Sequence, residues 1–281
     1  MTAAGTGVTR RAAVLGSPVA HSLSPVLHRA AYQALGLSGW AYDAYEVPEV
    51  DLPHFLQGLD DSWAGLSLTM PLKAAVLPLL DVVAPVVQTV GAANTVLLSG
   101  GRRSGDNTDV PGIVTALAEH GVRRVSSVAV LGGGATARAA LAAAASVTDS
   151  CTVYSRSDRR ATALEATADA VGLALAVGSW DDATEALAAP LVVNTTPAGA
   201  ADVLAQDLPS DVGTLFEVLY DPWPTPLAAA WAQRGGTVVD GLDLLVHQAV
   251  LQVGLMTGAA VDVPGLADLL RAAGRRALRP A

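Results

Sequence analysis

Short apolar stretches alternate with alanine-rich stretches along the chain, an order that is typical of strands followed by helices. The first third predicts one hairpin, in which 95–98 pairs with 102–104 around the turn Ser99–Gly100–Gly101. The other strands expected in this part are 12–15, 41–47 and 66–69. The helices expected there are 26–35 and 50–59.

The same alternation continues from residue 110 to the C-terminus. After a helix at 110–120, we expect strands at 128–131, 151–154, 191–194, 214–219 and 237–239. The expected helices are 135–145, 158–171, 242–257 and 264–278. This order predicts an α/β fold with a domain boundary between 105 and 125. The stretch 235–243 is a candidate second crossing that would return the last helices to the first domain.

Composition narrows the function and the compartment. The net charge of −9 argues against a nucleic-acid-binding protein, which needs a basic face. No apolar run approaches the ~20 residues of a membrane span. We also expect no targeting segment, because the apolar stretch after Arg10–Arg11 is too short for a signal peptide. With Cys151 as the only cysteine, a reducing compartment, and hence the cytoplasm, is expected.

One basic residue differs in kind from the others. Lysine and arginine together number 17, and Lys73 is the only lysine, so the rest are arginines. Codon bias explains why lysines are rare in this chain, but not why one remains. Because a lysine can exchange a proton and an arginine cannot, Lys73 is a candidate for chemistry.

A glycine-rich turn follows the strand at 128–131. Gly132, Gly133 and Gly134 lead into a helix that begins at Ala135, and Ala137 stands where a third motif glycine is usual. Such a turn lets the backbone approach a pyrophosphate at a helix N-terminus, whose free N–H groups bind anions. A purely structural glycine turn is the alternative.

The end of the next strand indicates which dinucleotide would bind. Where an acidic residue would contact the ribose of NAD, the chain has Ser155, followed by Arg156, Arg159 and Arg160. Arginines without an acid suit a 2′-phosphate, so we favour NADP. The alternative is a solvated helix start with Ser157 as its N-cap.

Polar residues also gather at the predicted strand ends of the first domain. Ser22 and Ser24 precede a helix opened by Pro25, where they could cap the helix or hold a substrate carboxylate. Thr69 ends a strand and Lys73 follows it in the first turn of a helix. Asn94 and Asp109 have the ordinary interpretations of a turn residue and an N-cap.

Three further polar positions occur late in the chain. Thr195 lies at a polar strand end facing the expected cofactor, and Tyr220 lies in a proline-rich loop after a strand. Gln248 lies in an otherwise apolar helix, where a buried amide needs a partner. The first half of the chain has no cysteine–histidine pair, nucleophile motif or metal-ligand spacing, and no metal is expected.

Taken together and in this order, the segments from Gly16 to about Gly258 resemble the shikimate dehydrogenase family. No single motif carries the resemblance; their ordered co-occurrence does. The motifs are Pro18-x-x-His21-Ser22-x-Ser24-Pro25, Thr69-x-Pro71-x-Lys73, Gly91-Ala92-x-Asn94-Thr95, Asn107-Thr108-Asp109-x-x-Gly112 and Tyr220-x-Pro222-x-x-Thr225.

The resemblance implies a fold and a reaction. Proteins similar to this chain have an N-terminal α/β substrate domain, a Rossmann-like NADP-binding domain, and C-terminal helices that pack back on the first domain. For this chain the corresponding division is 1–109, 110–241 and 242–281. These proteins reduce 3-dehydroshikimate to shikimate with NADPH, reversibly, in aromatic amino acid biosynthesis.

The resemblance also implies roles for individual residues. Lys73 would supply the proton to the oxygen of the reduced carbonyl, and Asp109 would hold the orientation of the Lys73 side chain. The positions matching substrate contacts are Ser22, Ser24, Thr69, Lys73, Asn94, Asp109, Tyr220 and Gln248. The serines and Tyr220 would hold the carboxylate, and the remaining side chains would meet ring oxygens. The positions matching cofactor contacts are Gly132, Gly134, Ala135, Arg156, Arg160, Thr195 and Gly241.

The chain departs from the family pattern at several positions. Ser67 replaces an asparagine before the lysine motif, and Glu217 replaces an aspartate before the Tyr220 loop. Arg29 and Leu244 replace a usual asparagine and methionine. None of these changes removes a proton-transfer group.

Other functions stay open at this point. The nearest is a quinate/shikimate dehydrogenase that uses NAD, against which the basic end of the second Rossmann strand argues. A non-catalytic sensor of shikimate-like acids and an unrelated two-domain Rossmann enzyme are the others. The expected partner is a small-molecule substrate, with no nucleic acid and no membrane. Oligomeric state is open, and a homodimer is the hypothesis we carry forward.

Overall fold

The computed structural model describes residues 7–157, 160–263 and 265–279 and divides them into two compact units. Unit 1 comprises the described residues of Met1–Gln88, Ala92–Thr108 and Val246–Ala281, and unit 2 those of Thr89–Gly91 and Asp109–Leu245. The described residues of the last helices from Val246 onward belong to unit 1. The expected division into functional domains at 109/110 and 241/242 stays a prediction. The boundaries between the compact units lie between Thr108 and Asp109 and between Leu245 and Val246.

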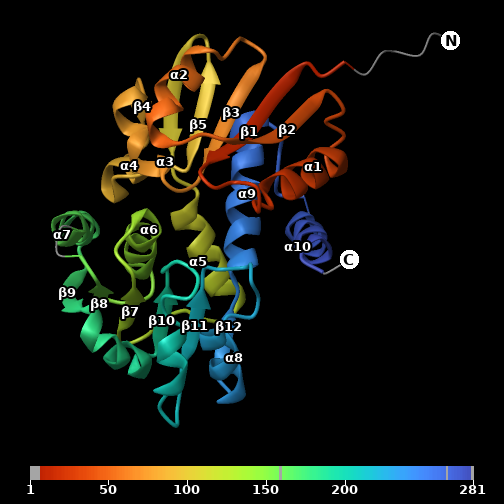
Figure 1. Cartoon of the computed structure of the whole chain (residues 1–281). Helices are drawn as coiled ribbons and strands as arrows, with labels where there is room; N and C mark the ends of the chain where they lie inside the picture. Colours follow the sequence, from red (N-terminus) through yellow and green to blue (C-terminus); the bar gives the residue numbers. More distant parts are fainter. Residues whose placement is uncertain (1–6, 158–159, 264, 280–281) are drawn as a thin grey trace. The chain divides into compact units, whose positions relative to one another are not determined.

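Unit 1 is built on a mixed six-stranded sheet with the order β2-β1-β3-β5-β6-β4 (Figure 1). β1 is parallel to both β2 and β3, whereas β5 runs antiparallel to β3 and to β6. The strands are β1 (Arg10–Gly16), β2 (Trp40–Glu46), β3 (Trp63–Leu68), β4 (Val82–Val83), β5 (Thr95–Ser99) and β6 (Arg102–Asp106). The predicted hairpin is confirmed: Gly100 and Gly101 both have positive φ, as a two-residue hairpin turn requires.

Helices cover both faces of this sheet. Alternate β3 residues face a core that includes Leu66 and Leu68 and packs against the short helices on one side. On the other side, α9 lies so close to β3 that a Cβ on Gly65 would be 2.7 Å from Met256 Cγ. The helices are α1 (Ser24–Ala34), α2 (Leu52–Gln57), α3 (Leu72–Ala75), α4 (Pro85–Val90), α9 (Gly241–Thr257) and α10 (Leu266–Ala277).

Unit 2 contains a fully parallel sheet with the order β9-β8-β7-β10-β11-β12. This is the strand order 3-2-1-4-5-6 of a Rossmann fold, which binds ligands where the order reverses, between β7 and β10. The strands are β7 (Val128–Leu131), β8 (Ser150–Ser155), β9 (Ala174–Ser179), β10 (Leu191–Asn194), β11 (Thr214–Glu217) and β12 (Thr237–Val239). One face packs against α5 (Asp109–Glu119), α6 (Ala135–Ala144) and α7 (Ala161–Val171), and the other against α8 (Pro226–Gln233).

The sequence analysis missed the smallest elements and the edge of unit 2. It did not predict β4, α4, α8 or β9, whereas it did expect the helix start at α3 that carries Lys73. β9 is an edge strand with mostly exposed side chains, so apolar alternation does not mark it. The expected strand 214–219 ends earlier, at Glu217, whose carboxylate bonds to neighbouring segments. The expected helix starts at Asp158 and Pro264 lie outside the described residues.

A buried histidine gives unit 1 a pH-dependent stability. The His28 ring stacks on Tyr42 with a centroid distance of 3.8 Å, and its Nδ1–H donates to the Ser24 carbonyl at 2.9 Å. Burial lowers the pKa of His28 to about 4, so the native state keeps this ring neutral. Its contribution to stability is complete above the unfolded pKa of 6.5 and is lost as pH falls toward 4.

We expect His28→Phe, which keeps the stacking on Tyr42, to flatten the acid side of the stability profile. The wild type should lose up to about 3 kcal/mol of its free energy of unfolding through His28 as pH falls from 6.5 to 4, and His28→Phe should not show this loss. Urea unfolding at several pH values measures this, with His54→Gln at an exposed position on α2 as the control. An unchanged acid slope in His28→Phe would contradict the assignment.

Candidate functional site

The predicted substrate residues of unit 1 gather at one edge of its sheet. β1 and β3 end there, β5 begins there, and β6 returns there, because β5 is antiparallel to both of its neighbours. Ser22 and Ser24 follow β1, Thr69 and Lys73 follow β3, and Asn94 immediately precedes β5. The topology therefore brings together segments that are far apart in the sequence.

Asn94 is buried and held by several hydrogen bonds. It is 1% exposed, and its Oδ1 accepts from the backbone N–H of Thr108 and from the hydroxyl of Thr95, each at 2.8 Å. Its Nδ2 donates to the Thr108 hydroxyl at 2.9 Å and to Gln248 Oε1 at 3.3 Å. The predicted need of Gln248 for a partner is thus met, and two substrate-contact candidates lie side by side in unit 1.

The two serines lie at the start of α1. Ser24 is its first residue and is buried, and the Ser22 hydroxyl accepts from the Ser24 backbone N–H at 3.3 Å. The N-cap position of α1 is Leu23 and has no side-chain cap hydrogen bond, so neither serine is the N-cap residue that the capping interpretation expects. The Ser22 hydroxyl accepts one hydrogen bond next to the helix start and can still donate its own hydrogen to a carboxylate.

Thr69 and Lys73 flank the beginning of α3. The Thr69 backbone N–H donates to the Leu15 carbonyl at 2.9 Å, which joins the ends of β1 and β3. Lys73 is half-buried, and its carbonyl accepts from the Ala93 N–H at 2.8 Å. The lysine backbone is thereby tied to the segment that carries Asn94. α3 itself is a single turn of four residues.

In unit 2, the glycine turn lies at the point where the strand order reverses. Gly132 has a φ of +109°, and a Cβ on it would lie 2.6 Å from Thr195 Oγ1. The Thr195 hydroxyl and backbone N–H both donate to the Leu131 carbonyl at 2.8 Å, which binds the end of β7 to the end of β10. Ala135 begins α6, and Ala137 is fully buried where a third glycine would be.

Arginines surround this turn. A Cβ on Gly133 would lie 3.2 Å from Arg160 Cδ, so the Arg160 side chain extends over the glycines. Burial and the charge of Arg160 lower the pKa of Arg138 on α6. Arg156 is exposed directly after β8. This concentration of positive charge at a helix N-terminus suits a phosphorylated ligand.

The remaining predicted residues of unit 2 lie at element ends. Asp109 is the buried first residue of α5, Tyr220 is half-buried three residues after β11, and Gly241 is the buried first residue of α9. The described residues contain no group of three histidine, cysteine, aspartate or glutamate side chains that could hold a metal. Among the described helices, none has both the length and the apolarity to cross a membrane.

Glu217 organises the ends of β10 and β11 in this unit. Its Oε2 accepts from Asn194 Nδ2 at 2.8 Å and from the Thr225 hydroxyl at 3.0 Å. Its Oε1 accepts from the Leu219 N–H at 3.3 Å. Burial raises the pKa of Glu217, and these hydrogen bonds act in the opposite direction. The longer glutamate thus holds both ends of the loop that carries Tyr220.

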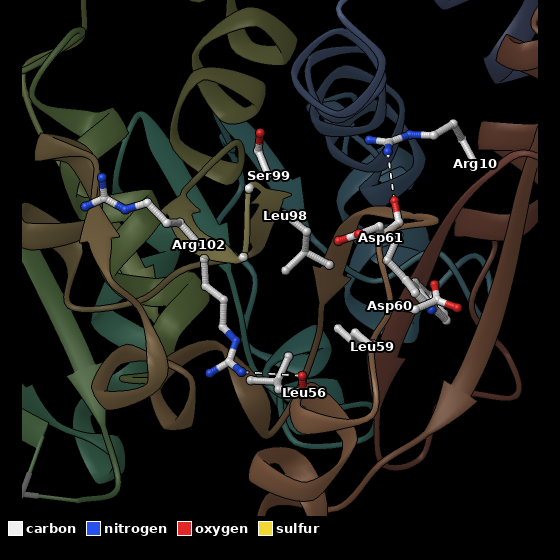
Figure 2. Close-up of a pocket in the computed structure, with 12 residues that line it drawn as sticks. Arg10, Leu56, Leu59, Asp60, Asp61, Leu98, Ser99 and Arg102 are labelled. Atoms are coloured by element: carbon white, nitrogen blue, oxygen red, sulfur yellow. Dashed lines mark hydrogen bonds between the residues drawn. The ribbon is translucent and has the colours of Figure 1, made fainter.

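A cavity of about 390 Å³ in unit 1 lies away from the predicted site (Figure 2). It is formed at the opposite edge of the sheet, where β1 and β3 begin and the β5–β6 hairpin turns. Arg10 contributes to its wall, and one of its guanidinium nitrogens donates to the Asp61 carbonyl at 3.1 Å. None of the predicted site residues lines it.

Sequence reasoning missed Gln252, which contacts both β3 and the Asn94 segment. A signal was present, since Gln252 follows Gln248 by one helical turn and lies on the same face of an apolar helix. Two amides at this spacing on an apolar helix indicate that polar groups of another segment pack against the same face of the helix.

Two alanine substitutions separate a pyrophosphate turn from a structural glycine turn. At Gly134, φ is −84° and an added Cβ would meet nothing closer than Arg160 Nη1 at 3.9 Å. We expect Gly134→Ala to keep its melting temperature but to weaken NADP⁺ binding at least about tenfold, because the methyl group excludes close phosphate approach. Gly132→Ala should destabilise unit 2 by about 1–3 kcal/mol. Thermal melts and calorimetric titration measure both effects, and unchanged NADP⁺ affinity in Gly134→Ala would favour the structural interpretation.

Comparisons with known proteins agree with this arrangement. The family model described as the shikimate dehydrogenase substrate binding domain matches residues 14–96. The NADP(+) shikimate dehydrogenase of one Thermus thermophilus strain is 38% identical over 267 residues, which cover 94% of this chain and 98% of the relative.

Solved structures extend the likeness to both units. The shikimate dehydrogenase of Mycobacterium tuberculosis is 39% identical with a TM-score of 0.85, over 94% of this chain and 99% of that one. The enzyme of a second Thermus thermophilus strain, determined with NADP(H) and shikimate, is 36% identical with a TM-score of 0.82, over 96% of this chain and all (100%) of that one. The chain belongs to the NADP-dependent shikimate dehydrogenase family.

Proposed function

We propose that this protein catalyses the reversible, NADPH-dependent reduction of 3-dehydroshikimate to shikimate in aromatic amino acid biosynthesis. The observation that carries the proposal is the buried amide pair Asn94 and Gln248, located at the same sheet edge as the serines, Thr69 and the only lysine. This set of side chains offers hydrogen-bond donors and acceptors to a small hydroxylated acid. Binding a nucleic acid or a lipid surface would not require such a buried polar set.

Each substrate residue takes the role that the family motif gives it. Ser22, Ser24 and Tyr220 hold the substrate carboxylate through their hydroxyls. Thr69, Asn94 and Gln248 bind the ring oxygens together with Lys73 and Asp109. These are assignments by motif, supported in unit 1 by the common sheet edge and by the Asn94–Gln248 hydrogen bond.

The proton transfer is assigned to Lys73 and Asp109. NADPH supplies a hydride to the carbonyl carbon of 3-dehydroshikimate. The Lys73 ammonium gives its proton to the carbonyl oxygen as that oxygen gains negative charge, so a hydroxyl forms and the lysine becomes neutral. Asp109 orients the ammonium group and afterwards shares the proton that Lys73 regains from water.

Unit 2 provides the cofactor residues. Gly132, Gly134 and Ala135 let the pyrophosphate approach the N-terminus of α6, and Thr195 lies against Gly132. Gly241 is assigned to the cofactor by the family motif. Arg156 and Arg160 bind the 2′-phosphate that distinguishes NADP from NAD. Support comes from the Rossmann strand order and from the Arg160 side chain lying over the glycines.

We also propose the cellular setting. Cys151 is buried and burial raises the pKa of its thiol to about 12, so it is poorly reactive and the chain has no other cysteine for an intramolecular disulfide. This fits the cytoplasm. We propose small-molecule ligands as the partners, without nucleic acid or membrane, and a homodimer as the assembly to be tested by analytical ultracentrifugation.

The deciding experiment follows nicotinamide absorbance with shikimate or quinate, each with NADP⁺ or NAD⁺. We expect turnover with shikimate and NADP⁺ to exceed every other combination. Preferred turnover of quinate or use of NAD⁺ would instead establish a quinate/shikimate dehydrogenase. A rise in melting temperature with shikimate but no turnover under any condition would establish a binding protein.

A further inference from the structure

Gln252 is fully buried on α9, and its amide makes three hydrogen bonds within unit 1. Its Oε1 accepts from the Ser67 hydroxyl at 2.7 Å. Its Nε2 donates to the Thr95 hydroxyl at 2.9 Å and to the Asn94 carbonyl at 3.1 Å. Burying an amide costs free energy unless its hydrogen-bonding groups are all bonded. One turn later on the same helix, Met256 packs against Gly65 on β3 with an apolar side chain. An apolar side chain can therefore fill the space between α9 and β3, so packing alone does not explain why position 252 carries an amide.

These contacts control the direction of the Thr95 hydroxyl. Because Gln252 Nε2 donates to Thr95 Oγ1, the hydroxyl hydrogen of Thr95 is left for Asn94 Oδ1, at 2.8 Å. The backbone N–H of Thr108 also donates to this oxygen. Asn94 Oδ1 is thus occupied by donors, and the Nδ2 hydrogens of the amide are directed at Thr108 Oγ1 and Gln248 Oε1.

The orientation passes on to the second amide. Asn94 Nδ2 donates to Gln248 Oε1, so the Nε2 hydrogens of Gln248 point away from Asn94. Both amides are therefore held in one orientation, with the Asn94 Nδ2 hydrogens directed at Thr108 Oγ1 and Gln248 Oε1. The face that this part of unit 1 offers to a substrate ring depends on that orientation.

Ser67 belongs to the same chain of hydrogen bonds. Its hydroxyl accepts from the Tyr42 hydroxyl at 2.6 Å and donates to Gln252. Its single hydrogen is therefore used, although family members have an asparagine at this position. In this chain the residue supports Gln252 from behind and donates nothing further.

We propose that Gln252 is a positioning residue for substrate binding, which acts through the Thr95 hydroxyl to hold the Asn94 and Gln248 amides in one orientation. The inference rests on the proposed function, because it assumes that these two amides meet the substrate ring. It adds a residue that contacts neither substrate nor cofactor and yet sets the affinity for substrate.

The test compares Gln252→Met, Thr95→Val and the double variant with the wild type. We expect each single variant to raise the KM for shikimate about tenfold while the KM for NADP⁺ stays within about twofold, since unit 2 is untouched. The double variant should raise the shikimate KM no further than one single variant, because both remove the same relay. Met256→Ala, which disturbs the same helix without the amide, should lower the melting temperature and leave both KM values unchanged.

Several outcomes would overturn the inference. Multiplicative KM effects in the double variant would mean two independent structural defects. An equal KM rise in Met256→Ala would mean that loose packing of α9 is the cause. If Gln252→Met does not fold, Thr95→Val alone decides, and an unchanged shikimate KM in that variant refutes the relay. A wild type without shikimate turnover would overturn the proposed function itself, whereas turnover with unaffected variants overturns only the role of Gln252.

Discussion

Lys73→Ala is expected to lower kcat for shikimate oxidation by about 10²- to 10⁴-fold, the usual contribution of a positioned acid–base group. Shikimate binding should weaken less, because Asn94, Gln248 and the serines remain. The lysine backbone bonds to the Ala93 segment through its carbonyl, so the side chain can be removed without breaking that link. Steady-state kinetics and calorimetric titration with shikimate separate the two effects.

Two further substitutions sharpen this prediction. Lys73→Arg keeps the positive charge but cannot release a proton, so it should fail as Lys73→Ala does. Asp109→Asn should lose turnover and change the pH–rate profile if the two groups act together. Near-wild-type turnover in Lys73→Ala would refute the assignment, and an unchanged pH profile in Asp109→Asn would refute the coupling.

Replacing Arg156 and Arg160 together by alanine is expected to raise the KM for NADP⁺ by about 10²-fold or more. Hydrogen bonds to charged groups contribute about 1.5–3 kcal/mol each, and only NADP carries the 2′-phosphate. The KM for NAD⁺ should change much less. Because the Arg160 side chain lies over Gly133, we expect Arg160→Ala alone to weaken both cofactors somewhat. Arg156→Ala alone should affect NADP⁺ almost exclusively.

Arg124 offers a matched control in the same unit. It is exposed and forms an ion pair with Asp149, just before β8 begins, whereas Arg156 follows the other end of that strand. Arg124→Ala removes the same charge without touching the glycine turn, so both cofactors should keep their KM values. An equal loss for NADP⁺ and NAD⁺ in the double variant would show that the two arginines do not contact a 2′-phosphate.

Local chemistry made much of the architecture predictable. The Ser99–Gly100–Gly101 hairpin and the strand–glycine turn–helix at 128–135 depend on residues next to one another, and the structure has both. Short or exposed elements such as β4 and β9 were not predictable, because their pairing is set by neighbours distant in the sequence.

The sequence by itself determined the α/β fold class, the glycine turn, the basic strand end and, through ordered motifs, the family. Only the tertiary structure decided how the polar side chains are oriented. Ser67 and Gln252 are 185 positions apart, and Asn94 and Gln248 are 154 apart, yet each pair shares a hydrogen bond. No local pattern specifies such pairs, because they form only when α9 packs on β3 and β5 and the buried amides must find partners there.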